Sequence, residues 1–306
     1  MTCDLTSPMF TSEEAAIAHM EHSRWPNGAI CPLCGADNVT KMGGKTQTGM
    51  FLCNACRGKF TVRTGTIFER SHIPMHKWLL ATHLMAASKK GISAHQLHRM
   101  LGITYKSAWF MAHRIREAMA PAADAGPVGG PGKIVEADET EISPSRKSKV
   151  ENRAKRSTRK RFVALVERDG QVRSAVIDGR NMYDVRTAVW ANLDPLSILH
   201  TDGAQVYKGM MLVGQHESVD HDKMYARDSN NGRVHTNTAE GYFSLFKRGL
   251  VGTYQHISPA HMPRYLAEFD FRMNNREKLG VNDVGRAARI LKGAEGKRLT
   301  YRQNAH

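Results

Sequence analysis

The spacing of apolar residues separates an N-terminal part rich in predicted helices from a longer part in which strands and helices alternate. Up to residue 120, apolar positions often recur three or four residues apart, the period of a helix that buries one face. They predict helices over residues 12–22, 75–89, 93–101 and 104–119. Residues 121–132 then read PAADAGPVGGPG, with three prolines and four glycines. Because neither residue type favours a continued helix, this stretch predicts a linker between domains.

The last two of these helices predict a DNA-binding motif. A short helix over 93–101, a turn at Gly102 and a longer basic helix over 104–119 form the pattern of a helix-turn-helix. Apolar positions such as Ala108 and Ile115 are expected to face the core. Polar residues of the second helix are then left for DNA: Lys106, Ser107, His113, Arg114 and Arg116. The alternative is an all-helical linker domain with ordinary charged faces.

After the linker, short apolar runs predict a mixed sheet flanked by helices. Strands are expected over residues 133–140, 161–167, 172–177, 197–201 and 217–220. Asp169 and Gly170 separate the second and third of these strands, which is a hairpin signal. Helices are expected over 182–193, 237–248, 259–275 and 281–291, with a helical turn near 207–211. The polar stretch at 227–233 predicts a loop that becomes ordered on DNA.

Three acids stand at the ends of separate elements in this part of the chain. Asp138 ends the first strand, Asp202 ends the strand after the first helix, and Glu240 lies in the first turn of a later helix. Parallel neighbouring strands can bring two such acids to one crevice. Three carboxylates can hold two divalent ions about 3.5–4 Å apart, and hard oxygen ligands select Mg²⁺ or Mn²⁺. Spacing alone leaves other acids in competition with Asp138: Glu136, Glu139 and Glu141.

The helix over 237–248 also presents a lysine together with its acid. Lys247 follows Glu240 by seven residues, close to two helical turns, so the two side chains share one face. The side chain of Asn237 or Thr238 is expected to cap the start of the helix. Lys247 and the adjacent Arg248 are candidates for contact with a DNA phosphate. Taken alone, the pattern also fits a surface helix with an ordinary ion pair.

Four of the five cysteines form two C-x2-C pairs, which predict a metal site. Cys31 and Cys34 are separated by eighteen residues from Cys53 and Cys56, a spacing that suits four thiolates around one structural Zn²⁺. The alternative, a pair of redox-active motifs, needs a thioredoxin-like context that the sequence lacks. Cys3 stands outside the pattern. The basic residues of this ribbon are equally compatible with a solvated face and with DNA contact.

The charge balance indicates a polyanionic partner. Lysine and arginine number 44 against 29 acidic residues, a formal net charge of +15. Nucleic acid is the usual partner of such a chain, and a basic membrane-surface protein is the alternative. No apolar run approaches the ~20 residues of a membrane helix, and the N-terminus lacks the signal-peptide pattern. We therefore expect a reducing compartment, where paired cysteines favour metal over disulfides.

A basic segment lies between the first two predicted strands of the second part. Residues 145–161 carry nine lysines and arginines, including Lys155 and Arg156, against a single acid, Glu151. We expect a loop that grips DNA through its positive charge. The alternative is a solvated loop without a partner.

Several of these motifs, in this order, resemble one known family. They are RWPNGAICPLCG, the second C-x2-C pair, HTDGAQVY, HTNTAEGYFSLFKRG and YLAEFDFRMNNR. Together they are similar to bacterial insertion-sequence transposases of the DDE type with an N-terminal zinc ribbon, the ISXO-like family. The resemblance implies that Asp138, Asp202 and Glu240 are the three catalytic acids and Lys247 the family's lysine. Some relatives have a different residue at the third-acid position, and Asn237 lies close by.

The resemblance also implies a domain organisation and an activity. The expected chain is multidomain α+β, with a helix and zinc ribbon over 1–70, a helix-turn-helix region over 71–120, a linker over 121–132 and a ribonuclease H-like mixed α/β catalytic domain over 133–306. The expected activity is metal-dependent cutting of the element's ends and their joining to target DNA. We expect a homo-oligomer on double-stranded DNA, in the bacterial cytoplasm at the nucleoid. The alternatives are a DNA-binding regulator with an inactive second domain, and a nuclease that only hydrolyses.

Overall fold

The computed structural model describes residues 4–44, 48–142, 160–177, 181–210, 214–220 and 223–300. The chain forms two compact units. The first comprises the chain up to Ala120 together with the part from Val281 onward, and the second comprises Pro121–Gly280. No helix within these described ranges is long and apolar enough to cross a membrane. Most of the basic segment predicted to grip DNA, including Lys155 and Arg156, lies outside the described residues.

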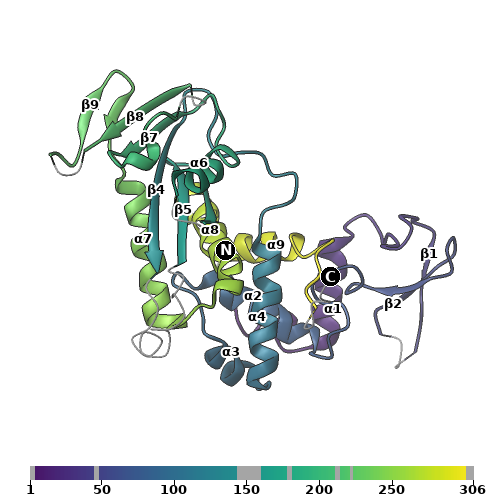
Figure 1. Cartoon of the computed structure of the whole chain (residues 1–306). Coiled ribbons are helices and arrows are strands. Elements are labelled where there is room, and N and C mark those ends of the chain that lie inside the picture. Colours follow the sequence, from purple (N-terminus) through teal and green to yellow (C-terminus); the bar gives the residue numbers. More distant parts are fainter. Residues whose placement is uncertain are drawn as a thin grey trace. The chain divides into compact units, whose positions relative to one another are not determined.

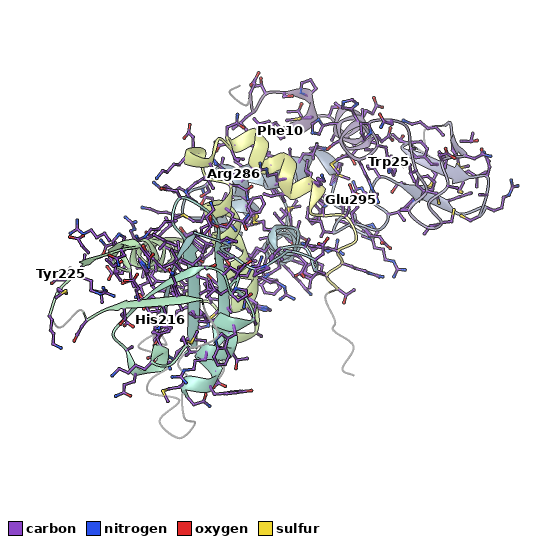
Figure 2. All side chains as sticks on the ribbon, turned by 90° about the horizontal axis from the view of Figure 1, so that it is seen from above. Phe10, Trp25, His216, Tyr225, Arg286 and Glu295 are labelled. Atoms are coloured by element: carbon purple, nitrogen blue, oxygen red, sulfur yellow. The ribbon has the colours of Figure 1, made fainter. Side chains whose placement is uncertain are left out.

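A three-stranded antiparallel sheet forms the ribbon of the first unit. Its strands pair in chain order: β1 (Val39–Lys41), β2 (Met50–Cys53) and β3 (Lys59–Thr61). The ring of Trp25, labelled in Figure 2, meets the rings of Phe51 and Phe60 edge-on at centroid distances of 5.5 and 5.8 Å. Cys31 and Cys53 are buried in the same cluster. Three aromatic rings therefore supply a small core directly beside the cysteines.

The described residues of the first unit contain five α-helices, close to the positions that the sequence predicts. They are α1 (Glu13–Arg24), α2 (Met75–Ala87), α3 (Ala94–Leu101), α4 (Tyr105–Met119) and α9 (Asp283–Lys292). The hydroxyls of Ser12, Ser93 and Thr104 each accept a hydrogen bond from a first-turn N–H of α1, α3 and α4, at 3.4, 3.1 and 3.2 Å. Gly102 ends α3 with a φ of 58°, a left-handed conformation that glycine adopts without a Cβ clash.

Several polar residues of α4 turn inward. Arg114 and Arg116 are 8% and 3% exposed, and His113 is 1% exposed. The Nε of Arg114 donates to the backbone carbonyl of Leu299 at 3.2 Å, so the guanidinium serves the packing of the first unit. The expectation that these three residues contact DNA is therefore corrected, because their side chains are enclosed within the unit.

The C-terminal helix belongs to the first unit. α9 packs on α2 and α4, and Ile290 is completely buried. The Nε of Arg286, labelled in Figure 2, donates to the carbonyl of Ala86 at 3.0 Å. The second unit consequently ends at Gly280, which corrects the expectation of one domain over 133–306.

A five-stranded mixed sheet forms the centre of the second unit (Figure 1). Its strands, given in spatial order, are β6 (Val172–Ile177), β5 (Lys160–Glu167), β4 (Ile134–Ile142), β7 (Ile198–Asp202) and β8 (Gln215–Val219). β5 runs antiparallel to β4 and to β6, whereas β4, β7 and β8 are mutually parallel. The expected mixed sheet is confirmed, and β4 lies at its centre.

Helices cover both faces of this sheet (Figure 1). α6 (Met182–Trp190) packs on one face, where Val135 and Ala137 of β4 join its apolar core. α7 (Asn237–Gly249) and α8 (Met262–Asn274) pack on the other face, around Phe162 of β5. Because successive side chains of a strand point to opposite faces, Glu136 and Asp138 lie on the face of α7.

The stretch predicted as a loop at 227–233 is mainly a β-hairpin. β9 (Arg227–Ser229) and β10 (Gly232–Val234) pair antiparallel. The carboxylate of Glu217 in β8 accepts hydrogen bonds from the side chains of Arg227, Ser229 and Asn231 at 3.1, 3.0 and 2.8 Å. The loop prediction is therefore wrong for most of this stretch, because one carboxylate of a neighbouring strand binds its polar side chains.

Candidate active site and zinc ribbon

The two aspartates of the candidate site lie on neighbouring parallel strands. β4 and β7 pair as far as Glu136 opposite His200, and Asp138 and Asp202 each follow this last pair by two residues. Asp202 ends β7 as predicted. Asp138 does not end β4, because that strand continues to pair with β5 as far as Ile142. The parallel pairing nevertheless brings both acids to one place.

Glu240 approaches the same place from α7. Its negative charge acts on Asp138, as does the charge of Asp202. Lys247 lies two turns further along α7, about 10 Å at 1.5 Å per residue, and both side chains are exposed. Asn237 is exposed at the start of the helix, where its N–H donates to Nδ1 of His235 at 3.3 Å. Three acids from separate elements therefore lie close enough for the charges of Asp202 and Glu240 to act on Asp138.

Their proximity changes the protonation of Asp138. Burial and then the charge of Asp202 raise the pKa of Asp138 to about 7, and the charges of Glu139 and Glu240 act in the same direction. The N–H of Glu139 donates to Oδ1 of Asp138 at 2.7 Å and opposes this rise. A bound cation would stabilise the ionised form of such a carboxyl group.

The other acids of β4 are engaged elsewhere. Glu136 is completely buried and accepts hydrogen bonds from the start of α7. Glu139 accepts a hydrogen bond from the hydroxyl of Tyr207 and pairs with Arg161 at 3.2 Å. Glu141 lies 3.4 Å from the same guanidinium. Asp138, by contrast, accepts only the adjacent Glu139 N–H among the hydrogen bonds of the described residues.

The three acids offer suitable donor atoms for a divalent cation in an open arrangement. Carboxylate oxygens are the ligands that Mg²⁺ and Mn²⁺ prefer. In the described part of the chain, only the four cysteines form a group of three or more potential ligands within 4.8 Å of one another. The carboxylates are thus further apart than in a closed metal site. Their fit to a cation depends on their chemistry and on the raised pKa of Asp138.

The four cysteines have the geometry of a structural zinc site. The Sγ atoms of Cys31 and Cys56 are 3.8 Å apart, and those of Cys34 and Cys53 are 3.6 Å apart. A tetrahedral zinc ion with 2.3 Å bonds separates its sulfur ligands by about 3.8 Å. The N–H of Cys56 lowers the pKa of the Cys53 thiol to about 7, which favours the thiolate that binds metal.

Two protein-family models match this chain. The ISXO2-like transposase domain matches residues 128–274, and the transposase zinc-ribbon domain matches residues 11–59. The chain belongs to the ISXO2-like transposases. The first match contains the three acids of the candidate site and the second contains all four cysteines, so the resemblance inferred from the sequence is confirmed.

Other proteins resemble the transposase over different shares of their length. An uncharacterized protein in transposable element ISH50 of Halobacterium salinarum is 26% identical over 294 residues, which cover 89% of this chain and 94% of that protein. Male abnormal protein mab-31 of Caenorhabditis elegans is 25% identical over 194 residues, which cover 57% of this chain and 45% of that protein. A simian T-cell lymphotropic virus intasome in complex with PP2A regulatory subunit B56 gamma aligns with a TM-score of 0.28 and 13% identity, over 57% of this chain and 63% of that chain, too weakly to carry an argument.

Some predicted DNA contacts of the transposase remain at its surface. Lys106 is exposed in the first turn of α4, and Ser107 beside it is half-buried. Lys247 and Arg248 are exposed near the end of α7. These side chains are placed where a phosphate backbone could reach them.

The residues that seat α7 were missed in the sequence. Neither Asn237 nor Thr238 caps the helix through its side chain; the N-cap is Thr236, whose side chain makes no capping bond. Instead Oε2 of Glu136 accepts the N–H groups of Thr238 and Ala239 at 2.7 and 3.1 Å. More than one hundred residues separate this carboxylate from the helix, so no local pattern could indicate the cap.

Replacing Asp138 by asparagine should stabilise the transposase increasingly as pH rises in the absence of added divalent ions. The folded chain retains the Asp138 proton to a pKa of about 7, whereas an ordinary aspartate loses it near 3.8, so the native chain loses stability between these values. The unfolding free energy of Asp138→Asn relative to native should therefore grow by roughly 1–3 kcal/mol between about pH 5 and pH 8.

Urea unfolding at the two pH values measures this difference. The exposed Asp228→Asn in β9 serves as the control and should show a pH-independent difference from native. An equally pH-independent difference for Asp138→Asn would contradict the raised pKa.

Proposed function

We propose that this transposase cuts the ends of its insertion sequence and joins the freed 3′-hydroxyls to target DNA in a metal-dependent reaction. The observation that carries the proposal is that Asp138 and Asp202 follow the paired segment of parallel β4 and β7 by two residues each, with the charges of Asp202 and Glu240 acting on Asp138. The second unit is then a ribonuclease H-like catalytic domain. Its strand order, with β4 between antiparallel β5 and parallel β7, supports that assignment.

The proposed roles follow from the position of each side chain. Asp138, Asp202 and Glu240 would hold Mg²⁺ or Mn²⁺, and Asp138 would give up its proton as it binds. Two ions held by these residues would supply activation of an attacking water or 3′-hydroxyl and stabilisation of the leaving oxygen. Lys247, on the same helix face as Glu240, would hold a DNA phosphate near the acids.

The first unit would supply recognition of the element's terminal repeats. The zinc ribbon and the pair α3 and α4, as a helix-turn-helix, are the candidates for this role, with Lys106 and Ser107 on the accessible start of α4. Because two ends must be held together for joining, the active form would be a homo-oligomer on DNA. Such a substrate places the reaction at the nucleoid, in the cytoplasm.

Joining of a pre-cut end distinguishes this proposal from its alternatives. The native transposase is incubated in Mg²⁺ or Mn²⁺ with a labelled fragment that carries a terminal repeat and a free 3′-hydroxyl, together with supercoiled target DNA. The expected product is labelled target. A fragment ending in 3′-deoxynucleotide is the matched control and should give none.

Each alternative predicts a different result. A nuclease that only hydrolyses would nick uncut ends but yield no labelled target. A regulator would bind the repeat and neither nick nor join. Either result with a repeat that is bound tightly would refute the proposed function.

Substitution of Lys247 by glutamine should lower the affinity for DNA and make that affinity less dependent on salt concentration. A lysine that neutralises one phosphate contributes about 0.9 to the slope of log K against log salt concentration. We therefore expect the slope for Lys247→Gln to fall by about one unit. Lys278→Gln is the control, because Lys278 is already paired with Asp169 at the β5–β6 turn. Equal slopes for native and Lys247→Gln would exclude the phosphate contact.

A further inference from the structure

We propose that Glu136 is a positioning residue that sets the place of Glu240 by binding the start of α7. The inference rests on the proposed function, because it assigns Glu136 a part in assembling the three-acid site. Glu136 would thus position a metal ligand, Glu240, without binding the metal itself. Glu136 shares the α7 face of β4 with Asp138, so one strand carries both a proposed ligand and the anchor of another.

The contacts of Glu136 come from the start of α7, from His235 before it and from Arg168 after β5. Its Oε2 accepts the N–H groups of Thr238 and Ala239. Its Oε1 accepts the hydroxyl of Thr238 at 2.9 Å and Nε of Arg168 at 2.7 Å, and lies 3.2 Å from Nδ1 of His235. The side chain of Glu136 has no exposed surface. A completely buried carboxylate thus accepts from four donors, three of which belong to Thr238 and Ala239.

Arg168 extends this anchor to the chain that enters α7. Its Nη1 donates to the carbonyl of Arg233 at 2.8 Å, and its Nη2 donates to the carbonyl of His235 at 3.2 Å. The same guanidinium pairs with Glu136, which binds the first N–H groups of α7. This ion pair therefore holds both the segment before α7 and the start of the helix. The end of β10 and the start of α7 are therefore tied to the central strand.

The position of Glu240 follows from this anchor. Glu240 lies one residue beyond Ala239, and its N–H donates to the carbonyl of Thr236 at 3.0 Å within the same turn. A helix is rigid over one turn, so a displacement of residues 238–239 displaces the carboxylate of Glu240. Residues that orient a metal ligand commonly change metal affinity by about 10- to 100-fold when they are replaced.

Glu136→Gln tests the role because glutamine keeps the size of the side chain but cannot reproduce its contacts. Both oxygens of Glu136 accept from donors, so either orientation of the amide places an NH₂ group against a donor. Glu268→Gln is the matched control. Glu268 is an equally buried carboxylate of the same unit, but it accepts from Tyr254, which lies beyond the opposite end of α7.

Two measurements on the full-length protein report on the position of α7. Hydrogen exchange without added divalent ions should show faster exchange at residues 236–243 in Glu136→Gln than in the native chain or in Glu268→Gln. Mn²⁺ titration followed by electron paramagnetic resonance should show weaker binding in Glu136→Gln by about tenfold. If Glu136→Gln does not fold, Thr238→Val, which removes one hydrogen bond to Glu136, should shift both readouts in the same direction.

The outcomes separate this inference from the proposed function. Unchanged exchange at 236–243 and unchanged Mn²⁺ affinity in Glu136→Gln, or in Thr238→Val where the first variant does not fold, would overturn the role of Glu136. An equal loss of Mn²⁺ affinity in Glu268→Gln would show that the effect of Glu136→Gln is general destabilisation, and would also overturn the role of Glu136. If the native protein binds no Mn²⁺, or if Asp138→Asn leaves its Mn²⁺ binding unchanged, the proposed metal site is wrong, whatever the exchange data show.

Discussion

Replacing Glu240 by glutamine should abolish cutting and joining of DNA ends while leaving DNA binding intact. Glutamine keeps the size of the side chain but removes the charge that a divalent cation would balance. Loss of one carboxylate ligand of the proposed site should reduce the rate by about a thousandfold or more, on the order of 4 kcal/mol in activation free energy. Cleavage and joining are measured on repeat-bearing DNA in Mg²⁺ and in Mn²⁺, and binding by electrophoretic mobility shift.

Glu277→Gln is the matched control for this variant. Glu277 is an exposed glutamate of the same unit, next to Lys278, which pairs with Asp169 at the β5–β6 turn. It should cut and join as the native protein does. Native-like activity of Glu240→Gln would remove Glu240 from the site, and the same assay with Asn237→Ala would then identify the alternative third ligand.

Loss of zinc should destabilise the ribbon of the first unit and lower the affinity for the terminal repeat. The ribbon has three short strands and a small aromatic core, so its stability should depend on the metal. Cys53→Ser removes a buried ligand, and we expect the purified variant to carry no zinc where the native chain carries one ion. Its affinity for the terminal repeat should fall by at least about tenfold, or 1.4 kcal/mol.

Metal analysis and repeat binding measure the two consequences separately. Cys3→Ser is the control, because Cys3 stands outside both C-x2-C pairs, and it should retain zinc and binding. A Cys53→Ser protein that still holds one equivalent of zinc would contradict the four-cysteine site. Loss of zinc without loss of repeat affinity would confine the ribbon to a structural role.

Local signals predicted the elements of the transposase well. The hydroxyls of Ser12 and Ser93 accept from N–H groups of the helices that directly follow them, so each of these helix starts depends only on neighbouring residues. The cysteine pairs are similarly local, since two short motifs define all four ligands. The alternating elements of the second part also predicted a mixed sheet, which the structure confirms.

Features that depend on distant partners could not be predicted in this way. The start of α7 is capped by Glu136 from β4, and Arg168 reaches both Glu136 and the chain before α7. Sequence spacing placed Glu136 only as a competitor of Asp138. In the structure the two residues differ: Glu136 is enclosed by the start of α7, whereas Asp138 lies beyond the last β4–β7 pair, where the charge of Asp202 acts on it.

The charged face of α4 illustrates the same limit. Arg114 has the helical position and charge of a DNA contact, yet its Nε donates to the carbonyl of Leu299, 185 residues further on. The C-terminal segment packs in the first unit and contributes to the burial of the Arg114 side chain. Periodicity within α4 carries no information about a partner that arrives from the end of the chain.

Anomalous diffraction from Mn²⁺ in crystals of the native transposase with its repeat-bearing DNA end would locate the proposed metal ligands directly. We expect two manganese peaks about 3.5–4 Å apart, bound by the carboxylates of Asp138, Asp202 and Glu240. Manganese bound elsewhere in crystals whose DNA is cut, or held by Asn237 in place of Glu240, would contradict this expectation.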